Sequence, residues 1–158
     1  MGELQDNGIG LDREHYAAFL ETDTDNKIAI GGKGVGRLLW LDCFETIKIE
    51  TTHKDGAAVR SRGFEFKLAD REQIKNLKEG KATPSTETGV AIKFSGLRNN
   101  GYRQKFPGRP LFVVYHLASH FLPMFIGDNC PNVTLECGET YNFPDAIDMT
   151  LPLPFNPG

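Results

Sequence analysis

Two glycine-rich segments near the start of the chain constrain its structure more than any other feature. The first, Asp6-Asn7-Gly8-Ile9-Gly10, follows residues 2–5, which are predicted to be the end of a strand. Its carboxylate can accept a hydrogen bond from an amino group, and its glycines allow a flat ligand to approach the backbone. The segment therefore suits a nucleobase, although Asp-Asn-Gly is also typical of an ordinary turn.

The second segment, residues 31–37 with the sequence Gly-Gly-Lys-Gly-Val-Gly-Arg, is predicted to open a helix. The unpaired amides and the positive dipole end of a helix N-terminus bind anions, and Lys33 and Arg37 add positive charge. The segment therefore has the properties of a phosphate-binding loop, although close packing of a helix on a sheet also selects glycine. It is not a Walker loop, because Gly-Lys-Ser and Gly-Lys-Thr are absent from the sequence.

The chain between these segments predicts a helix followed by a polar loop. Asp12 is a favourable helix N-cap, and the apolar residues Tyr16, Phe19 and Leu20 recur at helical spacing before polar residues 21–27 interrupt the pattern. A carboxylate turn and a phosphate-binding loop joined in this way indicate a nucleotide site with a lid.

Alternating apolar and polar residues predict strands over 47–50, 64–68 and 90–95. Asp55-Gly56 is a hairpin signal between the first two, and residues 69–87 are predicted to be a polar connection. Because all three strands are half polar, we expect an antiparallel sheet with one covered face.

Two further helices and a short strand are expected. One helix should begin within residues 31–36 and carry four residues into the core: Leu38, Leu39, Trp40 and Leu41. Another, over 110–125, should cover the sheet with a single apolar stripe: Leu111, Val114, Tyr115, Ala118, Leu122 and Phe125. A strand is expected at Val133 and Leu135, before a proline-rich tail.

The composition excludes several classes of protein. Among the 158 residues, 18 are basic and 21 acidic, so no nucleic-acid-binding surface is indicated. The most apolar stretch, Leu111–Phe125, is short for a bilayer and is interrupted by polar residues, and no signal peptide is expected. The three cysteines are too few and too dispersed for a disulfide framework or a structural zinc site. A cytoplasmic protein with reduced thiols is the resulting prediction.

The glycine segments together resemble the nucleotide boxes of the GHKL ATPases, which include gyrase B, heat-shock chaperones, histidine kinases and mismatch-repair proteins. Residues 6–10 resemble the first box, 27–41 the second box with its helix, and Thr88-Gly89-Val90-Ala91-Ile92 the third. Residues 117–136 resemble the corresponding stretch of bacterial chaperone-like members. The resemblance covers roughly residues 4–143.

The resemblance implies an α+β two-layer sandwich, the Bergerat fold, with a mixed, mostly antiparallel sheet covered by helices on one face. Residues 1–142 would be the C-terminal portion of such a domain, incomplete at its N-terminus, and residues 143–158 a tail or linker toward a following domain. ATP, with Mg²⁺, is the implied cofactor. In the complete protein ATP or ADP binding would close a lid, favour a homodimer and precede slow hydrolysis.

The resemblance also implies a role for individual residues. Asp6 would accept the adenine amino group, and Gly8 and Gly10 would form the floor and hinge of a lid over residues 11–33. Backbone amides would bind the phosphates, with Lys33 as a charged helper, at Gly34, Val35 and Gly36. No catalytic residue and no protein metal ligand is assigned.

Two departures from the family pattern qualify these expectations. Val90 stands where the third box usually has threonine, so the adenine contact loses a hydroxyl. The family's upstream helix, with its magnesium-binding asparagine and glutamate base, has no room before Asp6, so we expect weak binding and negligible hydrolysis. Glu72 and Asn76 have the spacing of that helix motif, but they follow both glycine boxes and are interpreted as a coincidence.

Other functions remain as alternatives. A Rossmann-type NAD-binding oxidoreductase would use residues 28–30 as a strand, 32–36 as the glycine fingerprint and Glu50 as the ribose-binding acid. A non-enzymatic degenerate fragment or interaction module is the second alternative. A calcium loop at residues 23–27 and a metal pair at His116 and His120 are weaker, since the first lacks its glycine and the histidines lie opposite the apolar stripe.

Overall fold

The computed structural model describes residues 2–20, 36–67, 72–99, 101, 104, 108–126, 132–136 and 139–147, and only the backbone of residues 36 and 37. The chain divides into two compact units, residues 1–104 and residues 105–158, which are described separately.

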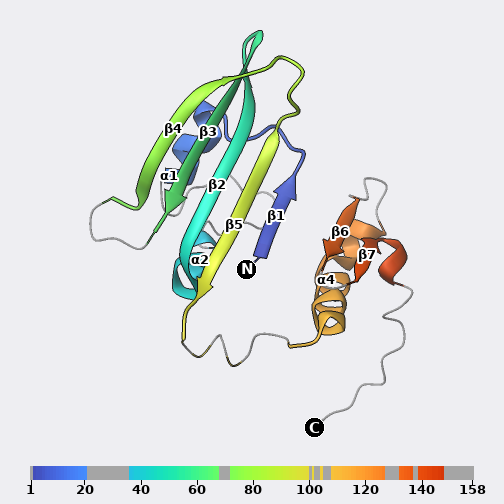
Figure 1. Ribbon diagram of the computed structural model, residues 1–158. Coiled ribbons are helices and arrows are strands. Elements are labelled where there is room, and N and C mark those ends of the chain that lie inside the picture. The colour runs from blue at the N-terminus through green and yellow to red at the C-terminus, as the bar shows by residue number, and fades with distance from the viewer. Residues whose placement is uncertain are drawn as a thin grey trace. The chain divides into compact units, whose positions relative to one another are not determined.

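The first unit is an α+β structure built on an antiparallel sheet (Figure 1). Its elements are β1 (Gly2–Asp6), α1 (Arg13–Leu20), α2 (Gly36–Cys43), β2 (Phe44–Asp55), β3 (Ala58–Phe66), β4 (Ile74–Ala82) and β5 (Gly89–Leu97). The strand order is β1-β5-β2-β3-β4, and every described pair is antiparallel. The predicted α+β class with a mostly antiparallel sheet is confirmed.

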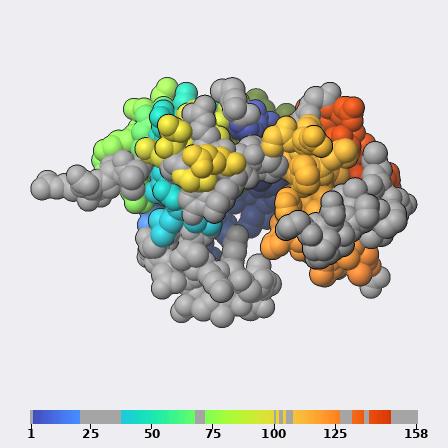
Figure 2. Space-filling view, turned by 90° about the horizontal axis from the view of Figure 1, so that it is seen from below, coloured from blue at the N-terminus to red at the C-terminus, as the bar shows by residue number. Residues whose placement is uncertain are grey.

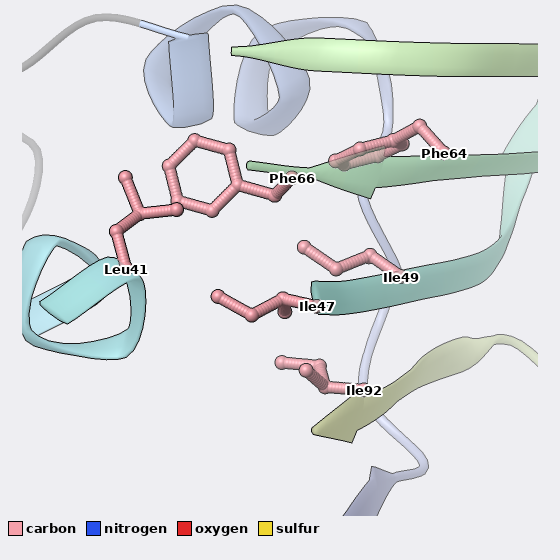
Figure 3. Packing of buried hydrophobic residues seen from close by; sticks show 6 residues of the cluster. All are labelled: Leu41, Ile47, Ile49, Phe64, Phe66 and Ile92. Carbon is pink, nitrogen blue, oxygen red and sulfur yellow. The ribbon is translucent and has the colours of Figure 1, made fainter. Parts of the chain in front are cut away.

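One face of this sheet holds the core, as the alternating pattern predicts. The buried residues come from α2 and three strands: Leu41, Ile47, Ile49, Phe64, Phe66 and Ile92 (Figure 3). Ile47 and Ile49 are fully buried, whereas Lys48 and Glu50 between and beside them are exposed on the other face. Burying each such aliphatic side chain contributes roughly 1.5–3 kcal/mol to folding.

Helices α1 and α2 cover that same face. Phe19 of α1 packs on Phe64 and Phe66, with ring centroids 5.5 and 5.2 Å apart. Trp40 of α2 packs edge-on against Phe94, and Leu41 points toward Phe66 (Figure 3). Covering the sheet by helices on one face is therefore observed within the first unit.

The prediction that α2 carries four consecutive residues into the core is wrong in part. Leu41 is buried and Trp40 half-buried, but Leu38 and Leu39 are 36% and 54% exposed. Four successive residues cover more than one full turn of an α-helix, so a helix lying on one sheet face cannot bury them all.

The N-cap predicted at Asp12 is confirmed. The backbone N–H of His15 donates to Asp12 Oδ1 at 2.9 Å, and the His15 ring lies 2.8 Å from the same oxygen. The backbone hydrogen bond, followed by the side-chain one, lowers the pKa of the Asp12 carboxyl. The carboxylate form thus stabilises the start of α1.

Replacing Asp12 by alanine is expected to cost about 1 kcal/mol of stability at about pH 7. Because the folded-state pKa is lowered, the carboxylate's contribution is complete above the unfolded-state pKa and is lost as the pH falls through the folded-state value. Asp12→Asn keeps the capping oxygen but removes the charge, so it serves as the control that isolates the contribution of the charge. Urea unfolding at several pH values measures the free energy of unfolding of the parent chain and of the variants. If the loss of unfolding free energy in Asp12→Asn does not become smaller at low pH, the expectation is contradicted.

The connection predicted over residues 69–87 contains a strand, β4, that the sequence pattern misses. β4 is an edge strand whose side chains are mostly exposed, so it lacks the apolar alternation that marks half-buried strands. Asn76 in β4 has a positive φ of 54°, and the register with β3 shifts between Gly63 and Glu65. Asn76 lies in a strand and Glu72 precedes it, so the two do not form the helix motif whose spacing they share.

The second unit has a small core of its own. It comprises α4 (Pro110–Phe125), β6 (Val133–Glu136), β7 (Thr140–Phe143) and η2 (Asp145–Ile147). Its buried residues are Val114, Ala118, Phe125, Tyr141, Phe143 and Ala146. Phe125 and Phe143 stack with centroids 5.1 Å apart. The helix and the strand at Val133 and Leu135 are confirmed, while the start of the predicted tail, Phe143 and Ala146, is part of this core.

The apolar stripe of α4 is narrower than predicted. Leu111 and Leu122 are 55% and 38% exposed, and side chains of α4, gold to orange, lie at the surface in Figure 2. The buried residues of α4 pack within the second unit, on β7 and η2. His116 and His120 are exposed, as expected. Over the described ranges, no helix has the length and apolarity needed to cross a bilayer.

Candidate functional site

Asp6 ends β1 and points to the face of the sheet that the helices cover. It pairs with Val90, which packs against the core, and directly paired residues of antiparallel strands share a face. The Gly8 N–H donates to Asp6 Oδ1 at 2.8 Å, which closes a tight turn and orients the carboxylate. Asp6 remains exposed, and a carboxylate can accept several hydrogen bonds, so it can bind a further donor.

Gly10 is buried where the segment after Asp6 crosses β2. A Cβ on Gly10 would overlap the carbonyl oxygen of Thr52 and lie 2.9 Å from Thr51 Oγ1. Its φ of +75° is in the left-handed region that favours glycine. The glycine predicted from the first box is therefore required for the segment to approach the sheet backbone.

Gly89, from the predicted third box, lies against the first. A Cβ there would overlap the Asp6 carbonyl oxygen and would lie 3.3 Å from Asn7 Cα. The two boxes are more than eighty residues apart in the chain and adjoin in the fold. Val90, in the position where threonine is usual, presents an apolar side chain beside Asp6.

Thr51 links these two segments, although no motif in the sequence marks it as a functional residue. Its hydroxyl accepts a hydrogen bond from the Leu11 N–H at 2.8 Å and donates one to the Gly89 carbonyl at 2.9 Å. Thr51 is 3% exposed. A signal was present, since Thr51 continues the buried alternation of Ile47 and Ile49 with a hydroxyl that needs partners when buried.

Replacing Thr51 by valine, which has the same shape, is expected to cost about 2 kcal/mol because two backbone groups lose their buried partner. Thr52→Val is the matched control, since the Thr52 hydroxyl makes a single exposed bond to the Glu87 carbonyl at 2.6 Å. Urea unfolding of both variants measures the difference. Equal costs for the two valines would contradict the linking role of Thr51.

The predicted phosphate loop is only partly described. Lys33, Gly34 and Val35 lie outside the described residues, as do the calcium-loop residues 23–27. Gly36 is the first residue of α2, the helix that packs on the same sheet face to which Asp6 points. The structure thus brings Asp6, Gly8 and Gly10 together and places the end of the second box over the same face.

Neither a metal site nor an activated thiol is found among the described residues. No group of three or more His, Cys, Asp or Glu side chains within the described ranges is arranged to hold a metal ion. Burial, followed by the charge of Asp42, raises the pKa of the Cys43 thiol, which disfavours the reactive thiolate. The site's described chemistry is therefore hydrogen bonding at Asp6 beside an apolar Val90.

No family model matches this chain, and no curated protein matches it in sequence.

Proposed function

We propose that this chain is an ATP-binding module of the GHKL type, with a Bergerat fold, in which Asp6 binds the adenine amino group. The observation that carries the proposal is the tight turn at Asp6 and its close packing on the sheet. Gly89 lies against the Asp6 backbone, and Gly10 lies against Thr51 and Thr52, at distances that only glycine permits. Such close backbone packing around an exposed carboxylate suits a planar base that carries a hydrogen-bond donor.

The chemistry of Asp6 sets the base preference. An ionised carboxylate only accepts hydrogen bonds, so it pairs with the amino group of adenine. A guanine bound in the same orientation would place its carbonyl oxygen, which is also an acceptor, against Asp6 and would have to turn to present its own donors. Val90, paired with Asp6 on the same face, offers an apolar surface for the base. We therefore expect adenine nucleotides to bind more tightly than guanine nucleotides.

The phosphates would be bound by the second glycine segment. In this proposal Lys33 and the amides of Gly34, Val35 and Gly36 contact them, at the start of the helix that packs on the face to which Asp6 points. The described residues do not fit a protein-held Mg²⁺, because no cluster of ligands accompanies Asp6, so no step is derived through the metal. Any Mg²⁺ would arrive with the phosphates.

The wider function follows from the same proposal. ATP would close the lid expected within residues 11–33 over the nucleotide and favour a homodimer of the complete protein. Of these residues 11–20 are described, and they pack on the sheet. Slow hydrolysis in that protein would reset the cycle, in the cytoplasm. The NAD-binding alternative needs a parallel strand-helix-strand unit, whereas β2, which carries Glu50, pairs antiparallel with both neighbours.

The experiment that tests the proposal is a comparison of ATP with GTP in equilibrium binding to the 158-residue chain. We expect ATP to bind about tenfold or more tightly, since a repelled base loses a hydrogen bond to a charged group. Equal affinities would mean that the chain binds only phosphate, and no binding of either would favour the non-enzymatic alternative.

A further inference from the structure

The segment between Asp6 and α1 carries the proposed adenine contact but belongs to no helix or strand. Residues 7–12 therefore depend on contacts with the sheet to keep one position. Leu11 is held through both of its backbone polar groups. Its N–H donates to Thr51 Oγ1 at 2.8 Å on β2, and its carbonyl accepts from Arg62 Nη1 at 2.9 Å on β3.

Arg62 differs from an ordinary surface arginine because its side chain is largely buried and is paired with a carboxylate. Its side chain is 11% exposed, and its Nε donates to Glu79 Oε1 at 2.7 Å on β4. Its guanidinium carbon lies 3.9 Å from the centroid of the Tyr16 ring, so the cation packs on the aromatic face. Burial raises the pKa of the Tyr16 phenol, with the charge of Arg62 opposing that rise, as expected for a desolvated ring beside a cation.

These contacts give one side chain three tasks. Arg62 binds the backbone of the segment, Tyr16 in the helix that follows it, and Glu79 in the edge strand. Only a planar guanidinium with several diverging donors can do this, because a lysine ammonium is a single point charge. Thr51, its neighbour in register on β2, holds the N–H of the same residue, Leu11.

We propose that Arg62 is a positioning residue for the nucleotide site: it holds residues 7–12 on the sheet so that the Asp6 carboxylate keeps its binding orientation. This inference rests on the proposed function, because it assumes that Asp6 contacts a base. When a binding segment occupies its competent position only part of the time, the apparent affinity falls by that fraction. Arg62 raises the affinity without touching the nucleotide.

Arg62→Lys, with Arg60→Lys as its matched control, tests this. Arg60 lies two residues away on β3, and among the described residues it makes an exposed ion pair with Asp55, in which both side chains are at least 41% exposed. Two readouts are needed: amide hydrogen exchange, which requires no nucleotide, and ATP affinity. Glu79→Gln, which keeps Arg62 but removes its charged partner, serves if Arg62→Lys does not fold.

In Arg62→Lys we expect the Leu11 amide to exchange about tenfold faster and ATP to bind about threefold to tenfold more weakly. Core amides of β2, such as those of Ile47 and Ile49, should be unchanged, and Arg60→Lys should resemble the parent chain in both readouts. Glu79→Gln should also speed exchange at Leu11 and weaken ATP binding, but by smaller factors than Arg62→Lys.

Unchanged exchange at Leu11 overturns the inference, whatever the nucleotide result. Faster exchange at Leu11 and at the core amides alike also overturns it, because Arg62 would then support only global stability. Faster exchange confined to the segment with ATP affinity unchanged overturns the positioning role. Failure of the parent chain to bind ATP overturns the proposed function and the nucleotide role, while the exchange data still decide whether Arg62 fixes the segment.

Discussion

Gly10→Ala is expected to destabilise the first unit by about 3 kcal/mol or more, which is a large part of the stability of an ordinary domain. Two costs combine at this position. The left-handed backbone, with φ of +75°, is unfavourable for alanine, and the new Cβ would overlap the Thr52 carbonyl oxygen. Relief of that overlap requires the segment after Asp6 to leave the sheet, so the proposed ATP binding should be lost as well.

Gly56→Ala separates the two costs. Gly56 also has a positive φ, of +62°, but a Cβ there would meet nothing within 4 Å. The Gly56→Ala variant should lose only about 1–2 kcal/mol of unfolding free energy, because only the backbone conformation is unfavourable. Unfolding in urea, followed by the fluorescence of Trp40, reports on the first unit because this is the only tryptophan. Equal losses in the two variants would show that Gly10 is not required by close packing.

Asp6→Asn is expected to weaken ATP binding by about tenfold to a hundredfold, the cost of losing a hydrogen bond to a charged acceptor. Asparagine can direct its amide NH₂ at the adenine amino group, so that two donors face each other, or accept with a neutral oxygen. The same NH₂ suits the guanine carbonyl, so the preference for ATP over GTP should fall further than the affinity itself.

Glu3→Gln is the control for Asp6→Asn. Glu3 is a carboxylate on the same strand, but it lies on the opposite face and its Oε1 is 3.7 Å from Lys93 Nζ. Its substitution removes the same charge and should leave ATP binding unchanged. If both variants bind ATP more weakly by the same factor, the effect is the chain's net charge and the assignment of Asp6 fails.

The elements that the sequence predicts well are those with one strongly patterned face. β2, β3 and β5 alternate because each is half-buried, and Asp12 caps a helix that its neighbours also favour. β4 escapes prediction because an exposed edge strand has little to bury, so its sequence shows no alternation. Leu38 and Leu39 show the opposite case, in which an apolar sequence predicts burial that does not occur. They stay exposed because the sheet lies on one side only of their short helix.

The candidate site shows the same division. Gly10 is predictable because a turn after a carboxylate calls for glycine, and the structure adds the reason, which is contact with Thr51 and Thr52. The roles of Thr51 and Arg62 cannot be predicted from the sequence, because Leu11, the residue that both bind, lies forty and fifty-one residues away from them. Only the folded sheet brings these residues together. An arginine in an alternating strand is typical of an exposed face. Arg62 is instead on the covered face, where it packs on the Tyr16 ring and donates a hydrogen bond to the Leu11 carbonyl.

The central claim is tested most directly by calorimetric titration of ATP and ADP, with and without Mg²⁺, into the 158-residue chain and its Asp6→Asn variant. We predict saturable binding of both nucleotides to the parent chain, with a dissociation constant on the order of 1 mM or below, and binding to the variant that is about tenfold to a hundredfold weaker. Absence of saturable binding to the parent chain, or equal binding to the variant, would contradict the assignment of Asp6 as the adenine-binding residue.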